Sequence, residues 1–151
     1  MSTDTGVPKI SRVFYRIIYG DTDCGGVTYY AHYLRLFEIG RTELFRASGL
    51  TYREVEEKYA LVLPVVEVYV RYRAPAHYDD LVEIETRISQ LNSYKVRFDY
   101  RIFRDKKLLV EGFTLHVPVA KKTGKLTKFP ACILQSLNSL YQSSKPEGLN
   151  E

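Results

Sequence analysis

Two carboxylates stand close together in a glycine-rich run near the start of the chain. Asp21 and Asp23 are two positions apart, and Gly25 and Gly26 follow at once. A carboxylate in a loop can act as a general base or as a nucleophile. Asp also bonds its own backbone readily in turns, so both residues could serve only as turn formers. From the composition of the loop alone, the turn-forming interpretation is the stronger one.

The same run begins like a calcium-binding EF-hand loop, but its later positions do not fit one. Gly25 occupies the next ligand position, and His32 stands where a bidentate Glu is needed. Calcium is therefore excluded, and the sequence predicts no metal site. The two cysteines, Cys24 and Cys132, match no metal-binding spacing and are expected to be free thiols.

The spacing of apolar residues predicts the elements that must position this loop. Alternating apolar residues predict a strand at Ser11–Tyr19, which the acidic loop then closes. A three- and four-residue spacing predicts one long helix at Tyr29–Ser48, with a main apolar stripe of Tyr30, Tyr33, Leu34, Phe37, Leu44 and Phe45. Leu36 and Ile39 lie off that stripe, so the helix is expected to be buried on most sides. Gly40 would let the helix press closely onto a sheet.

Four later segments alternate apolar and polar residues with a period of two, which is typical of antiparallel strands. Their apolar positions, expected to face the core, are Val66, Val68, Val70 and Tyr72; Val82, Ile84, Thr86 and Ile88; Tyr94, Val96, Phe98, Tyr100 and Ile102; and Phe113, Leu115, Val117 and Val119. Residues 104–107 are short enough for a hairpin, and Pro130 begins a short C-terminal helix. This order predicts an α+β fold, in which a curved antiparallel sheet of about five strands wraps one long helix.

The segment from Tyr19 to Glu43 resembles the signature of the 4-hydroxybenzoyl-CoA thioesterase-like family of hotdog proteins. An acidic loop of the form D-x-D-x-x-G leads into a helix that carries aromatic residues and a later E-x-x-R. The matching positions are Asp21, Asp23, Gly26, Tyr29, Glu38 and Arg41. The resemblance implies the hotdog fold and an enzyme that hydrolyses acyl-CoA or a related acyl thioester.

The resemblance also implies roles for residues of the loop. Asp23 would be the catalytic carboxylate, and the backbone N–H of Tyr30 would hold the thioester oxygen. A helix N-terminus suits that oxygen, because its unpaired N–H groups and positive dipole end stabilise negative charge. Tyr19 would contact the reacting group, and Gly26 and His32 would line the substrate site. Relatives often carry Asn at the position of His32, and some carry His at the position of Tyr30.

Lysines at a later turn suit the phosphates of CoA. Lys121 and Lys122 stand with Lys125 and Lys128 around one turn, and the first two are predicted to bind substrate. For any one of these lysines, a place at a solvated hairpin tip is a more ordinary explanation than phosphate binding. The net charge of +4 fits an anionic ligand but does not require one.

The chain is expected to form one domain at residues 11–141, with polar tails at 1–10 and 142–151. Its 151 residues, 45% of them hydrophobic, suffice for one core. No apolar run is long enough to span a bilayer, and free cysteines suit a reducing compartment, so a cytoplasmic location is predicted. No cofactor is expected beyond the CoA of the substrate. Exposed strand edges predict a homodimer or homotetramer.

Two other functions remain open from the sequence. A hotdog hydratase or dehydratase would also act on acyl thioesters, but such enzymes usually depend on a loop His paired with an acid. A sheet rich in Tyr and Arg could bind single-stranded RNA, although Glu111–Leu115 lacks the order of an RRM signature, so no nucleic acid is expected. The sequence leaves open the acyl group, the carrier (CoA or carrier protein) and whether Asp23 acts as nucleophile or base.

Overall fold

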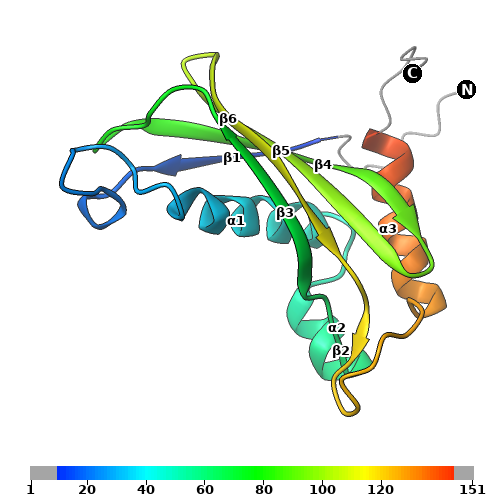
Figure 1. Cartoon of the computed structure of the whole chain (residues 1–151). Coiled ribbons are helices and arrows are strands. Elements are labelled where there is room, and N and C mark those ends of the chain that lie inside the picture. The colour runs from blue at the N-terminus through cyan, green and yellow to red at the C-terminus, as the bar shows by residue number, and fades with distance from the viewer. Residues whose placement is uncertain (1–9, 145–151) are drawn as a thin grey trace, which may run out of the picture.

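Five antiparallel strands form one curved sheet, in the spatial order β1-β4-β5-β6-β3 (Figure 1). The computed structural model describes residues 10–144. The strands of the sheet are β1 (Ser11–Arg16), β3 (Val65–Tyr72), β4 (Leu81–Asn92), β5 (Lys95–Arg104) and β6 (Lys107–His116). The other described elements are the helices α1 (His32–Arg46), α2 (Tyr52–Tyr59) and α3 (Ala131–Ser144) and the paired short strands β2 (Leu61–Val62) and β7 (Val119–Ala120).

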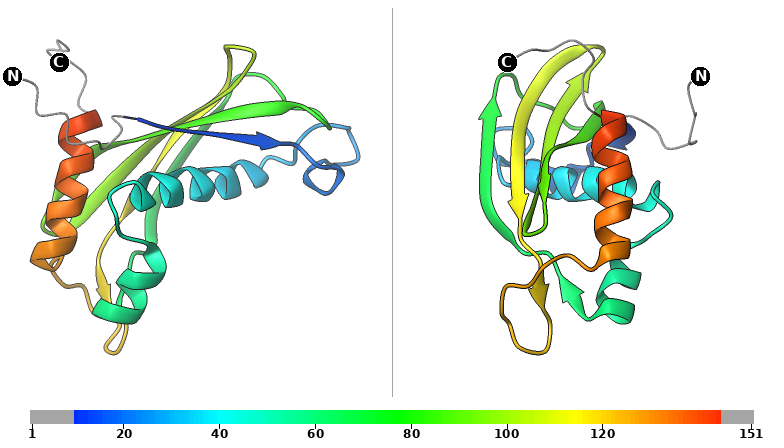
Figure 2. Two further views of the ribbon diagram at one scale, coloured as in Figure 1. Left: turned by 180° about the vertical axis from the view of Figure 1, so that it is seen from behind. Right: turned by 90° about the vertical axis from the view of Figure 1, so that its right-hand side faces the viewer.

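Two helices, α1 and α3, lie on the concave side of the sheet (Figure 2). Both pack against β4, and α1 also contacts β1 and β5. The predicted five-stranded sheet around a long helix is confirmed, but α1 alone does not cover the whole sheet. The long central strands extend past the end of α1, and α3 covers their far part, where Ile133, Leu137 and Leu140 are buried.

The inner face of α1 packs closely on the sheet. Phe37 is fully buried and stacks on Tyr100 of β5, with ring centroids 4.2 Å apart and planes 4° from parallel. A Cβ on Gly40 would collide with the hydroxyl of Thr86 on β4. The prediction that Gly40 permits close helix–sheet packing is confirmed.

The limits and the buried stripe of α1 differ from the prediction. The helix spans His32–Arg46 rather than Tyr29–Ser48, because a tight turn precedes it, in which the N–H of His32 donates to the carbonyl of Tyr29 at 2.9 Å. Leu36 is buried, whereas Leu34 is 38% exposed. The helix buries one face against the sheet and is not buried on most sides.

The sequence interpretation missed α2. Its N-cap is Thr51, whose hydroxyl oxygen accepts from the N–H of Glu54 at 3.1 Å. Thr followed three residues later by Glu is the pattern of a capping box, so the signal was present in the sequence. The helix ends at Tyr59 and is capped by Ala60, which adopts a left-handed conformation with φ 49°.

The predicted inner faces of β4 and β5 are confirmed except at Tyr94, which lies in the turn before β5 and is 46% exposed. Fully buried positions alternate along both strands and include Val82, Ile84, Val96, Phe98 and Ile102. The predicted hairpin at residues 104–107 joins β5 to β6. Asp105 and Lys106 at its tip have φ of 47° and 67°, as the tight turns that fit the twist of a hairpin require.

The predicted face of β6 is wrong. Thr114 and His116 pair with Phe98 and Val96 of β5 and are buried, so Phe113 and Leu115 point to the outer face. The buried polar groups bond to one another: His116 Nε2 lies 2.8 Å from Thr114 Oγ1, which lies 2.6 Å from the hydroxyl of Tyr100. Tyr100 of β5 completes this network, and the local pattern of β6 does not reveal such a partner, which makes the burial of these polar groups possible.

Strand β3 was predicted to face the core, and most of it does not. It is an edge strand beyond the cover of α1, and its exposed fractions are 54% at Val66, 47% at Val68 and 48% at Tyr72. Val70 packs against the core. The free edge of β3 thus carries apolar side chains that the chain itself leaves uncovered.

The predicted tails lie mostly outside the described residues, except that α3 continues to Ser144. Among residues 10–144, no helix is both long and apolar enough to cross a membrane. Cys24 and Cys132 are both free, as predicted.

Candidate active site

The acidic loop leaves β1 through a short 3-10 turn at Tyr19–Asp21 and then folds back on itself. Asp23 Oδ1 accepts hydrogen bonds from the backbone N–H of Gly25 at 2.8 Å and of Val27 at 3.4 Å. Gly26 reverses the chain with φ 79°, which favours glycine. Asp23 therefore forms a turn, and its side chain is exposed.

The second oxygen of the Asp23 carboxylate, Oδ2, has no hydrogen-bond partner among residues 10–144. The two N–H groups on Oδ1 hold the side chain in one orientation. The turn-forming role and a chemical role are thus compatible, since one oxygen forms the turn and the other is free to react.

The chain between the loop and α1 presents an unpaired N–H group. The N–H of Tyr29 donates to the carbonyl of Asp21 at 2.8 Å, and that of His32 donates to Tyr29. Within the described part of the chain, the N–H of Tyr30 has no acceptor. The hydroxyl of Tyr72 on β3 donates to the carbonyl of Tyr30 at 2.8 Å and so fixes the following peptide.

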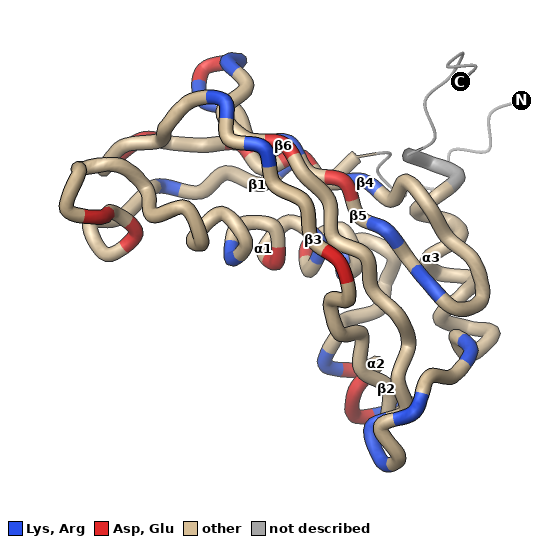
Figure 3. Tube along the Cα trace, in the orientation of Figure 1, with Lys and Arg blue, Asp and Glu red and all other residues tan. Residues whose placement is uncertain are grey.

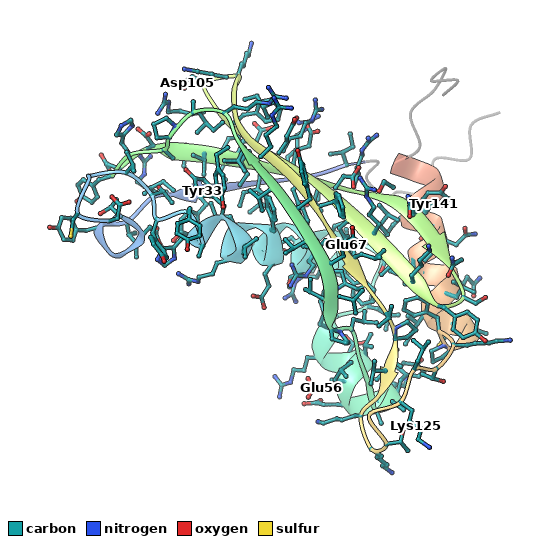
Figure 4. The ribbon with its side chains drawn as sticks, in the orientation of Figure 1. Tyr33, Glu56, Glu67, Asp105, Lys125 and Tyr141 are labelled. Carbon is teal, nitrogen blue, oxygen red and sulfur yellow. The ribbon has the colours of Figure 1, made fainter. Side chains whose placement is uncertain are left out.

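A cavity of about 280 Å³ lies beside this helix end. Its lining residues are Thr28, Tyr30, Tyr33, Tyr72, Arg73, Ala74 and Pro75 (Figure 4 labels Tyr33). The hydroxyl of Thr28 is buried and has no hydrogen-bond partner among the described residues. The sequence interpretation missed Thr28, Tyr33 and Tyr72, because they come from the loop, the helix and a distant strand that only the fold brings together. Asp23 is not part of the lining within one chain.

The other residues predicted at this end lie around the loop. Tyr19 is 79% exposed, and its ring meets that of Tyr78 edge-on at 5.9 Å. The His32 side chain is 28% exposed, and its Nδ1 lies 3.9 Å from Asp21 Oδ1. Both side chains are accessible from the surface of the loop.

The two lysines predicted to bind substrate lie elsewhere. Lys121 and Lys122 follow β7, at the end of the molecule that carries α2, whereas the acidic loop lies at the opposite end (Figure 3; Figure 4 labels Glu56 and Lys125). Lys121 Nζ pairs with Glu56 of α2 at 2.8 Å. One chain alone does not bring these lysines to Asp23.

A larger cavity, of about 610 Å³, lies on the outer face of the sheet. Its arginines are paired with acids: Arg101 with Glu85 on the neighbouring strand β4 at 2.6 Å, and Arg97 with Asp99 on the same strand, β5, at 2.8 Å. Arg97 also covers the ring of Phe113 at 3.8 Å. Because internal ion pairs neutralise this surface, it offers a weaker anion site than its arginine content suggests.

No group of three or more His, Cys, Asp or Glu side chains able to hold a metal ion occurs among residues 10–144. That the site uses neither a metal nor a cofactor remains a prediction. The groups that could do chemistry at the loop end are the carboxylate of Asp23 and the N–H of Tyr30, just before α1.

Comparison with known proteins identifies the family. Residues 19–137 match the family model of the thioesterase-like superfamily. The chain belongs to this superfamily. It is 36% identical over 121 residues to the acyl-CoA thioester hydrolase YbgC of Escherichia coli O6:H1, which covers 79% of this chain and 89% of that relative. The predicted family and its class of enzyme, a thioester hydrolase, are thus confirmed.

Solved structures confirm the hotdog fold of this superfamily member. A hypothetical protein from Thermus thermophilus, TT1821, superposes with a TM-score of 0.82 at 32% identity, covering 87% of this chain and 98% of the other. A mutant 4-hydroxybenzoyl-CoA thioesterase, crystallised with 4-hydroxybenzoyl-CoA, superposes with a TM-score of 0.78, covering 85% of this chain and 99% of the other. At 20% identity, the second likeness supports the fold alone.

Proposed function

We propose that this protein hydrolyses the thioester of an acyl-CoA, with Asp23 as its catalytic carboxylate. The observation that carries the proposal is the unpaired N–H of Tyr30 just before α1, which lies beside a cavity and follows a loop whose Asp23 carboxylate has one free oxygen. The membership of the chain in the thioesterase-like superfamily supports the same chemistry. The name of the Escherichia coli relative, an acyl-CoA thioester hydrolase, supports CoA as the thiol carrier.

The reaction would place the thioester carbonyl at the start of α1. Its oxygen would accept from the N–H of Tyr30, where the positive end of the helix dipole stabilises the charge that develops during attack. Asp23 would attack the carbonyl carbon or take a proton from a water that does so. The C–S bond then breaks, the CoA thiolate leaves and takes up a proton, and the acyl group leaves as a carboxylic acid.

The same proposal includes a homodimer formed through the edge of β3. A long exposed edge with apolar side chains favours pairing with another strand. Two β3 strands paired antiparallel by a two-fold axis would put the Tyr72 end of one beside the Val65 end of the other. The acidic loop of one chain would then approach the α2 end of its partner, where Lys121 and Lys122 could meet the phosphates of CoA.

The test compares wild-type protein with Asp23→Asn on a panel of acyl-CoAs, with thiol release as the measurement. Loss of the carboxylate is expected to lower kcat at least about 100-fold. Asp105→Asn is the matched control, because Asp105 is exposed in the β5–β6 turn and Asn tolerates its positive φ. Equal activity of wild type and Asp23→Asn would remove Asp23 from its role.

A further inference from the structure

Asp21 is buried, whereas Asp23, two positions later, is exposed. The exposed fraction of Asp21 is 3%. A turn does not require burial, since Asp23 forms one while exposed. Burying a carboxylate is costly unless neighbouring groups compensate for the lost water. The neighbours of Asp21 therefore indicate a role beyond that of a turn former.

The contacts of Asp21 join the end of β1 to the return of the loop. Its Oδ2 accepts from the hydroxyl of Tyr15 at 2.8 Å and from the N–H of Ile18 at 2.9 Å. Its own carbonyl accepts from the N–H of Tyr29 at 2.8 Å. Both ends of the loop that carries Asp23 are thus fixed by this one residue.

The other oxygen of Asp21 faces the first turn of α1. Arg35 Nη1 lies 3.7 Å and His32 Nδ1 lies 3.9 Å from Oδ1. Both distances are longer than hydrogen bonds. The Arg35 guanidinium lies within the range of ionic attraction, which is strengthened because Asp21 is buried. Asp21 therefore connects β1, the loop and α1, the three parts that place Asp23 relative to the N–H of Tyr30.

We propose that Asp21 is a positioning residue, which holds the Asp23 loop at a fixed distance from the start of α1. This inference rests on the proposed function. Asp21 acts through the loop and does not touch the substrate. Misplacement of a reacting group by about 1 Å can lower a rate about 100-fold, so the anchor matters for turnover rather than for binding.

The test measures kcat, KM and thermal stability for Asp21→Ala, Asp21→Asn and Tyr15→Phe, with Asp105→Asn as control. Asp21→Ala removes both hydrogen bonds, so we expect kcat to fall about 100-fold while KM stays within about threefold. Asp21→Asn keeps an oxygen that can accept both bonds and should retain kcat within about tenfold of wild type. Tyr15→Phe removes one bond and should lower kcat about fivefold.

A purely structural role would give a different result. In that case Asp21→Ala would melt at a lower temperature, but its kcat below the melting transition would equal that of wild type, and the proposal would be overturned. If Asp21→Ala does not fold, Asp21→Asn and Tyr15→Phe provide the test. A kcat of Tyr15→Phe equal to that of wild type would then overturn the proposal. Inactivity of the wild-type protein towards every acyl-CoA would instead count against the proposed function.

Discussion

The two ends of the sheet are each held by one buried polar side chain, but the two side chains differ in kind. At the acidic-loop end, the carboxylate of Asp21 accepts from Tyr15 and Ile18 and faces the guanidinium of Arg35 on α1. At the α2 end, the ring of His116 lies 2.9 Å from the carbonyl of Leu63, just after β2. One anchor is a carboxylate beside an arginine, and the other is an uncharged ring.

The surroundings of His116 explain why its ring stays neutral. Burial lowers its pKa to about 4, and the positive charge of Arg41 acts in the same direction. Its partners are the carbonyl of Leu63 and the hydroxyl of Thr114, neither of which is a counter-ion. The comparison teaches that acid acts on the α2 end, because protonation of His116 would bury a charge that has no counter-ion.

Acid should therefore lower the stability of the fold through His116 at the α2 end, and this is the largest effect we predict. The folded pKa of His116, about 4, lies below its unfolded value of 6.5, so the unfolded state binds the proton more readily in this window. Between about pH 7.5 and pH 4, this residue should cost the fold about 3 kcal/mol of unfolding free energy. Urea unfolding of wild type and His116→Gln at both pH values measures it, and the variant should lose less stability. Identical pH dependence in the two proteins would contradict the prediction.

In the proposed dimer, the acidic-loop end of one chain lies beside the α2 end of its partner. Disrupting the pairing of the two β3 strands should therefore separate these ends. Val68→Lys places a charge on the exposed edge strand, and we expect a monomer by sedimentation with kcat/KM at least about tenfold lower. Phe14→Lys is the matched control, because Phe14 is 63% exposed on the other edge strand, β1. A fully active Val68→Lys monomer would show that each chain holds a complete site.

Tyr72 tests the helix-end side of the site. Tyr72→Phe removes the hydroxyl that donates to the carbonyl of Tyr30 but keeps the edge-on contact with Tyr33 at 5.6 Å. Loss of one hydrogen bond should lower kcat about fivefold with little change in stability. Steady-state kinetics and thermal unfolding of the same samples measure both quantities. An unchanged kcat would mean that the N–H of Tyr30 is held without this bond.

The lysines should give the smallest effect. We expect the double variant Lys121→Ala, Lys122→Ala to raise KM for acyl-CoA about threefold at low salt and less at high salt, since both side chains are exposed. A short acyl thioester without the nucleotide of CoA is the control substrate, and its KM should not change. A rise in KM for both substrates would assign the lysines a role other than phosphate binding.

Much of the fold was predictable where local pattern and tertiary environment agree. The central strands β4 and β5 are buried on the side that their alternation indicates, and Gly40 marks the close approach of α1. The prediction failed at β6, where His116 is buried by virtue of bonds to Leu63 and Thr114. It failed also at β3, whose apolar residues resemble a core strand but lie at an edge.

The sequence by itself determined the acidic loop, the long helix that follows it and the family they indicate. It could not distinguish the two acids of the loop, because Asp21 and Asp23 are the same residue type in the same turn-rich segment. Only the tertiary structure buried Asp21 against Tyr15 and left Asp23 exposed with one free oxygen. Burial depends on neighbours that the fold supplies, whereas local spacing reports only what each residue could do.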